Sequence, residues 1–353
     1  MSRFSQAVVT AVRQDTPSAK VISIDCPDFK NADFRPGQYI TVRFELDGRD
    51  QRRSYSVCNL PTDGKFNIGV KQLENGVVSS HINEKLSAGH SIEVMAPDGN
   101  FVIRESADPV HHIFFAAGSG ITPVMSMIEH VVAQGRDTAT LFYGNRSAGD
   151  SMFKSQLEEF NNSSNLNVVN IYSDGSGASA LERGRIDFSK TLELLRTFVN
   201  TDLPKVNYIC GPSGMMTAVE NALADNGVAE SDIVKEHFVN PDQNVGDKHE
   251  DHAEPVGDFT GMAKIKVTLD GEEHSLELAT NGKVIVDAVL AAGMDAPFSC
   301  KGGVCTTCKA ELLSGKVNMD SNYALTDSEL EEGYILTCQA HPCTPEIEIT
   351  YDI

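Results

Sequence analysis

Four cysteines near the C-terminal end of the chain have a spacing that favours metal ligation. Cys300, Cys305 and Cys308 lie within nine residues, and Cys338 follows thirty residues after the third. A C-x4-C-x2-C run completed by a distant cysteine supplies the four thiolates that hold a [2Fe–2S] cluster. The alternatives are buried thiols without a metal, or a zinc site, although structural zinc prefers paired C-x2–4-C spacings. The spacing therefore predicts an iron–sulfur cluster.

A second group of residues has the chemistry to bind a planar cofactor that carries phosphate. Arg53, Tyr55 and Ser56 lie in one short run, and they offer a bidentate cation, a flat ring and a hydroxyl donor. Alone, such a run is usually no more than a strand. About twenty residues later, the segment Gly76 to Ser80 begins an expected helix, whose first amides have no partner within the helix and can bind phosphate. The two segments together predict a cofactor site.

A third motif, Gly118-Ser119-Gly120-Ile121-Thr122-Pro123, directly follows an apolar run expected to be a strand, His112–Ala117. We expect Thr122 to be the N-cap of the next helix and Pro123 to lie in its first turn, which places an anion site at the helix start. A glycine-rich loop alone is often only a tight turn. Cys210-Gly211 ends a later expected strand in the same region, and the motif on its own leaves both a tight turn and an anion site open.

The elements that must position these residues change character near Pro109. The earlier residues form short alternating runs separated by turns, which predict an antiparallel β-barrel over residues 1–108. Its expected strands include Tyr39–Phe44, Ser54–Cys58, Phe66–Lys71 and Ser91–Met95. Residues 109–238 alternate apolar strands with helices, which predicts an α/β, doubly wound parallel sheet. Its expected elements are His112–Ala117, Val124–Ala133, Thr140–Tyr143, Ser151–Phe160, Leu166–Tyr172, Thr191–Phe198, Val206–Cys210, Ser213–Asn226 and Ile233–Phe238.

The remaining residues form a linker and a small third domain. Residues 239–262 are polar, acidic and nearly free of large apolar side chains, so we expect a flexible linker there. Residues 263–353 are expected to form a small α+β domain. Its predicted elements are a hairpin of Ala263–Leu269 and Glu277–Leu278 about an Asp-Gly turn, a helix Val284–Ala292 and a closing strand Glu346–Tyr351.

The chain is strongly acidic, with 50 acidic and 29 basic residues among 353. Nucleic acids and anionic membranes are therefore expected to be poor partners. Residues 263–353 hold 15 acidic and 6 basic residues, which suits either a basic docking face on another protein or simple solubility. No apolar run approaches the ~18 residues of a membrane span. The N-terminus reads as an alternating strand with no signal core, so a cytoplasmic location is expected.

The first two regions resemble the ferredoxin–NADP reductase family of flavoproteins, which has the same R-x-Y-S, G-x-x-S and G-x-G-x-T-P motifs in the same order. The resemblance implies an FAD site and an NADPH or NADH site. It assigns FAD to Arg53, Tyr55, Ser56, Val70, Lys71, Gly76, Ser79, Ser80 and Phe238, and the nicotinamide nucleotide to Gly118, Gly120, Thr122, Pro123, Arg146, Ser173, Cys210 and Gly211.

The resemblance also implies four catalytic positions. Glu236 and Cys210 would lie near the nicotinamide, Phe238 against the flavin face, and Ser56 near the reactive nitrogen of the flavin. From the residues alone, Glu236 and Phe238 also fit a terminal strand with an exposed acid and a core aromatic. The choice of nucleotide stays open, because Asp174 disfavours a 2′-phosphate while Arg146, Arg183 and Arg185 lie nearby in sequence.

The C-terminal region resembles plant-type ferredoxin, which implies a β-grasp fold with Cys300, Cys305, Cys308 and Cys338 as ligands of the cluster. As a whole the chain resembles the single-chain reductases of multicomponent oxygenases, and among these the subfamily that serves ring-1,2-phenylacetyl-CoA epoxidases. The resemblance implies electron transfer from NAD(P)H through FAD and the cluster to a separate di-iron oxygenase, with the linker letting the cluster domain move between them. A reductase for another oxygenase or for a hybrid-cluster protein, and a non-enzymatic redox-sensing or structural metal module, are the alternatives.

Overall fold

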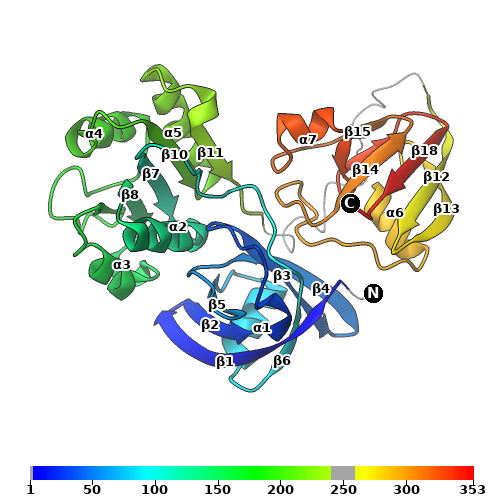
Figure 1. Ribbon diagram of the computed structural model, residues 1–353, viewed down its shortest axis with the longest axis horizontal. Helices are drawn as coiled ribbons and strands as arrows, with labels where there is room; N and C mark the ends of the chain where they lie inside the picture. Colours follow the sequence, from blue (N-terminus) through cyan, green and yellow to red (C-terminus); the bar gives the residue numbers. More distant parts are fainter. Residues whose placement is uncertain (1–2, 240–258) are drawn as a thin grey trace.

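The computed structural model describes residues 3–239 and 259–353. These residues form three units, each built on its own β-sheet (Figure 1). A six-stranded antiparallel sheet comes first, a five-stranded parallel sheet second, and a five-stranded mixed sheet with a two-stranded ribbon third. The predicted order of an antiparallel β domain, a doubly wound domain and a small α+β domain is confirmed.

The first unit is a strongly curved sheet in the strand order β4-β3-β6-β1-β2-β5. A bridge between Val57 and Ile68 connects the two ends of this sheet, which brings it toward a closed barrel. Alternate side chains point inward and form an apolar core, which helix α1 covers. The elements are β1 (Ser5–Thr16), β2 (Ala19–Asp25), η1 (Pro27–Phe29), β3 (Tyr39–Leu46), β4 (Arg49–Ser56), β5 (Lys65–Lys71), α1 (Val77–Lys85) and β6 (Ser91–Val94).

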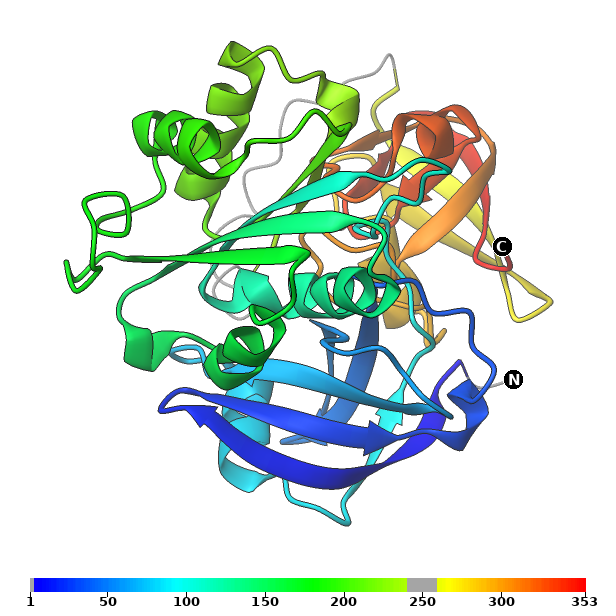
Figure 2. The same cartoon turned by 60° about the vertical axis from the view of Figure 1, so that its left-hand side comes forward.

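The second unit has the strand order β11-β10-β7-β8-β9, with every pairing parallel. Helices α2 and α3 pack on one face of the sheet, and α4 and α5 pack on the other (Figure 2). The elements are β7 (His111–Ala117), η2 (Gly118–Gly120), α2 (Ile121–Gln134), β8 (Thr138–Asn145), η3 (Ala148–Asp150), α3 (Lys154–Phe160), β9 (Leu166–Tyr172), α4 (Phe188–Phe198), β10 (Lys205–Cys210), α5 (Ser213–Asp225), η4 (Glu230–Asp232) and β11 (Ile233–Glu236).

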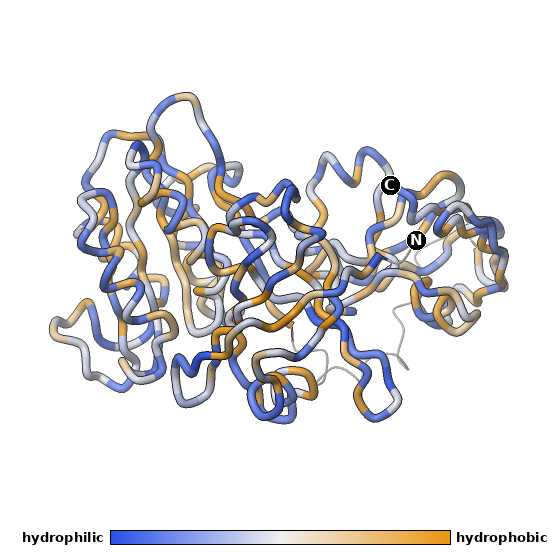
Figure 3. Tube along the Cα trace, turned by 60° about the horizontal axis from the view of Figure 1, so that its bottom comes forward, coloured by the Kyte–Doolittle hydropathy of each residue, from blue (hydrophilic) through white to orange (hydrophobic). Residues whose placement is uncertain are grey.

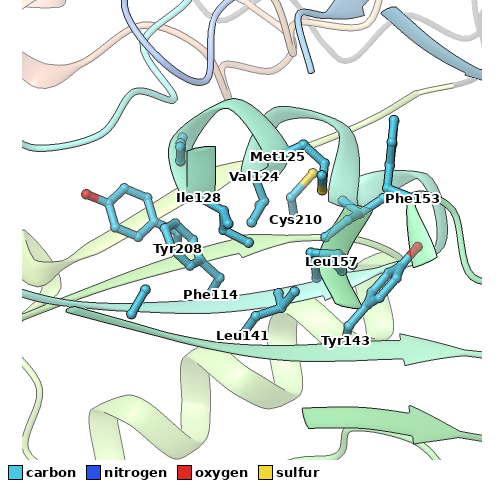
Figure 4. Packing of buried hydrophobic residues seen from close by; sticks show 14 of the residues in the cluster. Phe114, Val124, Met125, Ile128, Leu141, Tyr143, Phe153, Leu157, Tyr208 and Cys210 are labelled. Atoms are coloured by element: carbon cyan, nitrogen blue, oxygen red, sulfur yellow. The ribbon is translucent and has the colours of Figure 1, made fainter. Parts of the chain in front are cut away.

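The core beneath α2 also joins this sheet to the barrel. Phe114 and Leu141 of the sheet pack against Val124 and Ile128 of α2 (Figure 4). Barrel-side residues that include Val21 and Phe101 belong to the same buried cluster. The continuous apolar core holds the first two units together, so the sites they carry keep a fixed relation.

Two local predictions about this unit are wrong. Thr122 is not the N-cap of α2: the 3-10 turn η2 runs directly into the helix, which therefore begins one residue before Thr122, with Gly120 at the N-cap position. The Thr122 hydroxyl donates instead to the Ser119 carbonyl, 2.9 Å away. Strand β11 ends at Glu236 rather than Phe238, because its neighbour β10 ends at the paired residue Cys210.

The third unit has the strand order β13-β12-β18-β14-β16 and a separate apolar core. Its predicted hairpin is present, although the second strand has eight residues rather than two. The elements are β12 (Met262–Leu269), β13 (Glu272–Ala279), α6 (Ile285–Ala291), β14 (Lys309–Ser314), β15 (Val317–Met319), α7 (Asp327–Glu331), β16 (Tyr334–Leu336), β17 (Ala340–Pro342) and β18 (Glu346–Thr350).

The third unit packs on the barrel near the two ends of the chain. Arg3 donates to the carbonyl of Tyr351 at 3.0 Å and pairs with Asp352 at 3.2 Å. Hydrophilic stretches occupy many of the outer loops (Figure 3). Of the predicted linker, residues 240–258 lie outside the described residues. No helix within 3–239 or 259–353 is long and apolar enough to cross a membrane.

The buried His111 predicts an acid-sensitive parallel sheet. Its ring nitrogens lie 2.7 Å from the Thr138 hydroxyl and 3.1 Å from the Thr140 hydroxyl. Burial lowers the pKa of His111 to about 4. Between pH 6.5 and 4 the unfolded chain takes up a proton at this residue that the folded chain does not. Stability should therefore fall as the pH falls through this window, by up to about 3 kcal/mol from this group.

Calorimetric unfolding at several pH values between 4.5 and 7.5 measures this effect. His111→Gln, whose amide stays neutral, should flatten the decline of the transition that reports the second unit. His274→Gln, in the third unit, serves as the matched control. An unchanged pH dependence in His111→Gln would contradict the account.

Candidate functional site

A cleft of about 280 Å³ lies where the three units meet. Each unit contributes to its wall: the barrel through β4 and β5, the parallel sheet through the start of α2 and the end of β11, and the third unit through its cysteine loop. The lining residues are Tyr39, Arg53, Ser54, Tyr55, Ser56, Gly69, Lys71, Leu73, Ser79, Ser119, Thr122, Glu236, His237, Phe238, Val239, Ser299, Cys300, Val304 and Cys305.

The barrel side of the cleft contains five of the residues expected to bind FAD. Arg53, Tyr55 and Ser56 come from the end of β4, Lys71 from the end of β5, and Ser79 from α1. Arg53 is oriented by a 2.8 Å hydrogen bond from its guanidinium to the carbonyl of the preceding residue. A cation, an aromatic ring and hydroxyls therefore face one cleft.

The remaining residues predicted for FAD on the barrel shape the cleft from behind. The side chain of Val70 packs in the barrel core. Gly76 occupies the N-cap position of α1, where a Cβ would come within 2.3 Å of the Ser79 hydroxyl. The Ser79 hydroxyl in turn accepts a 3.2 Å hydrogen bond from the Leu73 amide, and Ser80 accepts one from Gln72 at 3.4 Å.

The residues predicted for the nucleotide line up along one edge of the parallel sheet. Gly118, Arg146, Ser173 and Gly211 each follow the carboxyl end of a different strand, namely β7, β8, β9 and β10. The chain order reverses between β7 and β10, and ligands of open α/β sheets bind at such a point. The structure therefore brings these separate segments of the chain to one edge of the sheet.

Glycines are required where this edge is most crowded. A Cβ on Gly120 would come within 2.2 Å of the Cys210 carbonyl, and one on Gly211 within 3.2 Å of Ala117. Gly118 differs, because its φ is +55° and a Cβ there would reach only the Lys71 amine, 4.0 Å away. The backbone at Gly118 therefore leaves space for a ligand, whereas Gly120 brings α2 close to β10. Pro123 is buried in the first turn of α2.

Glu236 has the most unusual environment of the predicted catalytic residues. It pairs with Cys210 across β10 and β11 and lines the cleft. Its Oε2 atom is buried and has no hydrogen-bond partner among the described residues. Burial, together with the nearby Cys305 thiol, raises the pKa of Glu236 to about 8. A buried polar atom without a partner is costly, so this carboxyl group fits a site completed by a bound molecule.

The other predicted catalytic residues surround Glu236. Burial raises the pKa of the Cys210 thiol well above its ordinary value, so the thiol stays protonated at neutral pH. Ser56 is buried on the barrel side of the cleft. Phe238 lies just beyond the end of β11 with 45% of its surface exposed, and it lines the cleft. An exposed aromatic ring at a cleft wall is available to cover a planar ligand.

The four predicted cluster ligands lie together in the third unit. All four thiols are buried, and none forms a disulfide. Cys300 is within hydrogen-bonding range of Cys305 and Cys338, and Cys338 is in the same range of Cys308. No three His, Cys, Asp or Glu side chains of the described ranges are arranged around a single ion. A two-iron cluster does not need that arrangement, because each iron takes two thiolates.

One main-chain and one side-chain amide also donate hydrogen bonds to the sulfurs. The Gly302 amide donates to the Cys300 sulfur at 3.4 Å, and the Gln339 side chain donates to the Cys338 sulfur at 3.7 Å. Hydrogen bonds to ligating sulfurs tune the reduction potential of a cluster. The loop is therefore suited in both its thiols and its donors to a [2Fe–2S] cluster.

Contacts between the barrel and the cysteine loop are the part of the site that the sequence did not reveal. Tyr39 of β3 accepts a 3.0 Å hydrogen bond from the Thr306 amide, and Ser54 of β4 donates to Ser299 at 2.8 Å. Nothing in the sequence near these residues indicates a partner more than 200 positions away. The contacts place Cys300 and Cys305 in the wall of the cleft predicted to hold FAD.

Comparisons with known families agree with this three-part site. Residues 7–103 match the oxidoreductase FAD-binding domain, residues 114–221 the oxidoreductase NAD-binding domain, and residues 267–343 the 2Fe-2S iron-sulfur cluster binding domain. The chain is 35% identical over 358 residues to one of the subunits of 1,2-phenylacetyl-CoA epoxidase from Escherichia coli, covering 100% of this chain and 99% of that protein. The chain belongs to the family of oxygenase reductase components.

Other reductases of this family serve different oxygenases. The ferredoxin reductase component of 3-ketosteroid-9-alpha-monooxygenase from Mycolicibacterium smegmatis is 33% identical, with 99% of this chain and 98% of that protein covered. The glycine betaine monooxygenase reductase subunit of Pseudomonas aeruginosa is 30% identical, with 88% and 85% covered. The chain is thus an oxidoreductase with FAD, NAD and 2Fe-2S domains.

Solved structures share the fold at lower identity. Phthalate dioxygenase reductase, described as a modular structure for electron transfer from pyridine nucleotides to [2Fe-2S], superposes with a TM-score of 0.60 at 21% identity, covering 98% of both chains. An intact type IV self-sufficient cytochrome P450 monooxygenase gives a TM-score of 0.71 at 22% identity. The match covers 98% of this chain but only 41% of that protein.

From the side chains at this edge of the parallel sheet we expect the reductase to prefer NADH. Asp174, just after β9, is exposed, and hydrogen bonds from Ser176 lower the pKa of its carboxyl group. Arg183 donates to the Gly177 carbonyl at 2.6 Å and to the Ala178 carbonyl at 3.3 Å, so it is engaged within its own loop. An ionised acid at this edge suits a ribose hydroxyl and repels a 2′-phosphate.

Replacing Asp174 by serine should raise kcat/KM for NADPH by about 10-fold and change that for NADH much less, because one repulsive charge is removed. Steady-state reduction of ferricyanide measures both ratios. Glu182→Gln, in the loop that follows β9, is the control for a general loss of negative charge. Equal effects of Asp174→Ser on the two nucleotides would show that this carboxylate does not discriminate between them.

Proposed function

We propose that this reductase supplies electrons to a di-iron oxygenase that epoxidises phenylacetyl-CoA in aerobic phenylacetate breakdown. The observation that supports this choice is the 35% identity to a component of phenylacetyl-CoA epoxidase, which extends over the whole length of both chains. The match includes the third unit, whose surface must meet the acceptor. The reductase itself does not bind phenylacetyl-CoA in this proposal.

The residues have distinct proposed roles. Arg53, Tyr55, Ser56, Lys71 and Ser79 bind FAD on the barrel side, and their arrangement around one cleft supports this assignment. The edge formed by Gly118, Gly120, Thr122, Pro123, Arg146, Ser173, Cys210 and Gly211 receives the nicotinamide nucleotide. FAD held by the barrel residues would supply the chemistry of accepting a hydride and releasing its electrons singly.

The protein contributes side chains that border and orient the reacting groups. Glu236 and the protonated Cys210 thiol border the nicotinamide position, and Phe238 covers the cleft from the end of β11. Cys300, Cys305, Cys308 and Cys338 hold the cluster beside the same cleft. The proposed division of the chain is residues 1–108 for FAD, 109–238 for NAD(P), 239–262 as linker and 263–353 for the cluster.

The test is NAD(P)H oxidation by the purified reductase mixed with a phenylacetyl-CoA oxygenase, with and without phenylacetyl-CoA. We expect oxidation that depends on this substrate and yields the epoxide in proportion to the nucleotide consumed. A 3-ketosteroid oxygenase and a glycine betaine oxygenase, each with its own substrate, are the matched controls.

Two outcomes would contradict the proposal at different levels. Coupling to one of the control oxygenases but not to the phenylacetyl-CoA oxygenase would keep the reductase function and overturn the choice of acceptor. Absence of bound iron and sulfide, together with no turnover of cytochrome c, would favour the redox-sensing or structural metal module.

A further inference from the structure

The two sides of the cysteine loop have different surroundings. Cys308 and Cys338 belong to the apolar core of the third unit. Cys300 and Cys305 belong instead to a separate small cluster with Tyr39 of the barrel and the partly buried Val239. The outward side of the cluster site is therefore the side that carries Cys300 and Cys305, and the barrel covers it in this structure.

Hydrogen bonds hold the barrel over this outward side. Thr306 donates to Asp98 at 2.6 Å, and Thr307 lies 3.3 Å from Thr41. These two contacts, together with the Tyr39–Thr306 and Ser54–Ser299 hydrogen bonds, join the barrel to residues on both sides of Cys300 and Cys305. Another protein cannot approach these two ligands while the contacts are made. We call the residues 295–299 and 304–307 of the third unit the docking face.

The groups on the docking face favour a positively charged partner. Asp295, 62% exposed at its side chain, pairs with the Arg52 guanidinium, and the Ala296 carbonyl accepts from the same group at 3.2 Å. The Phe298 ring lies 4.4 Å from the guanidinium carbon. Arg43 lies 4.0 Å from Asp295. A carboxylate, a carbonyl and an aromatic face together make a receptor for an arginine side chain.

We propose that the docking face is also the surface that the acceptor protein binds, and that the acceptor offers a basic patch with an arginine or lysine in place of Arg52. This inference rests on the proposed function as a reductase for a separate protein. The barrel and the acceptor then compete for one face, so loading of the cluster and delivery from it alternate.

The electron balance sets how often the face must change partners. Oxidation of one NAD(P)H to NAD(P)⁺ and a proton releases two electrons, and the cluster carries one at a time. Two deliveries of one electron each are therefore needed for every nucleotide, and a di-iron acceptor receives both of them for one epoxidation. The docking face must bind the barrel twice and an acceptor twice in each cycle.

The first test separates delivery from loading by reducing the protein beforehand. The holoprotein is reduced anaerobically with dithionite, freed of excess reagent and mixed with oxidised cytochrome c, a small basic haem protein, in a stopped-flow instrument. Asp295→Lys should slow cytochrome c reduction by about 10-fold at low salt, because a charge in the contact is reversed. The difference should shrink as added salt screens it.

Glu277→Lys is the matched control, because it makes the same change in net charge at an exposed position of β13. It should change delivery less than about twofold, as expected for a charge outside the contact. Equal rates in the two variants would overturn the proposal, since the acceptor would then use another face. Failure of the wild-type protein to reduce cytochrome c would count instead against the proposed function.

A second test needs no turnover. The Ser54 and Ser299 hydroxyl oxygens are 2.8 Å apart, which is close enough for a disulfide in Ser54→Cys/Ser299→Cys. Excess oxidised cytochrome c should slow formation of this bond, scored by mass spectrometry, whereas an acidic protein such as serum albumin should not. Iron and sulfide contents of the double variant and of Ser299→Cys alone establish that the cluster is intact. If oxidised cytochrome c leaves the rate of disulfide formation unchanged, the barrel and the acceptor do not compete for one face.

Discussion

The organisation of the site depends on one buried guanidinium group between the barrel and the ferredoxin domain. Arg52 is only 1% exposed, and it bonds Asp50 on its own strand and Asp295 and the Ala296 carbonyl across the interface. Burial opposes its charge, but the two carboxylates more than compensate and raise the pKa of Arg52. A buried cation is tolerated only with such partners. Separating the domains therefore requires water to replace Asp295 and the Ala296 carbonyl as partners of Arg52.

Strand geometry connects this interaction to the flavin site. Side chains alternate across β4, so Arg52 faces the ferredoxin domain while Arg53 faces the cleft, and Ser54 and Tyr55 repeat the alternation. One strand thus carries Arg53 and Tyr55 of the proposed FAD site on one face, and with Arg52 and Ser54 on the other face it contacts the docking face. This arrangement brings Cys300 and Cys305 into the wall of the cleft. The proposed FAD residues and the cysteine loop therefore both lie against β4.

Local chemistry was predictable from the sequence, and long-range contacts were not. The cysteine spacing, the Gly118 to Pro123 loop and the residues of β4 each carry their signal within a few positions, and the structure brings them to one cleft. The prediction of Thr122 as N-cap was wrong because η2 runs directly into α2. The strand predicted over Ile233–Phe238 was too long because β11 ends where its neighbour β10 ends. The Arg52–Asp295 pair joins residues 243 positions apart, so only tertiary packing reveals it.

The most direct measurement of the central claim is the rate at which electrons pass from reduced flavin to the cluster in Arg52→Gln, with Arg49→Gln, an exposed arginine of the same strand, as the control. Stopped-flow absorbance after mixing with NAD(P)H resolves both steps. We expect flavin reduction to stay near the wild-type rate and cluster reduction to slow by about 10-fold or more, because a buried ion pair of the docked state is lost. Cluster reduction at the wild-type rate in Arg52→Gln would contradict the claim that this guanidinium holds the two centres together.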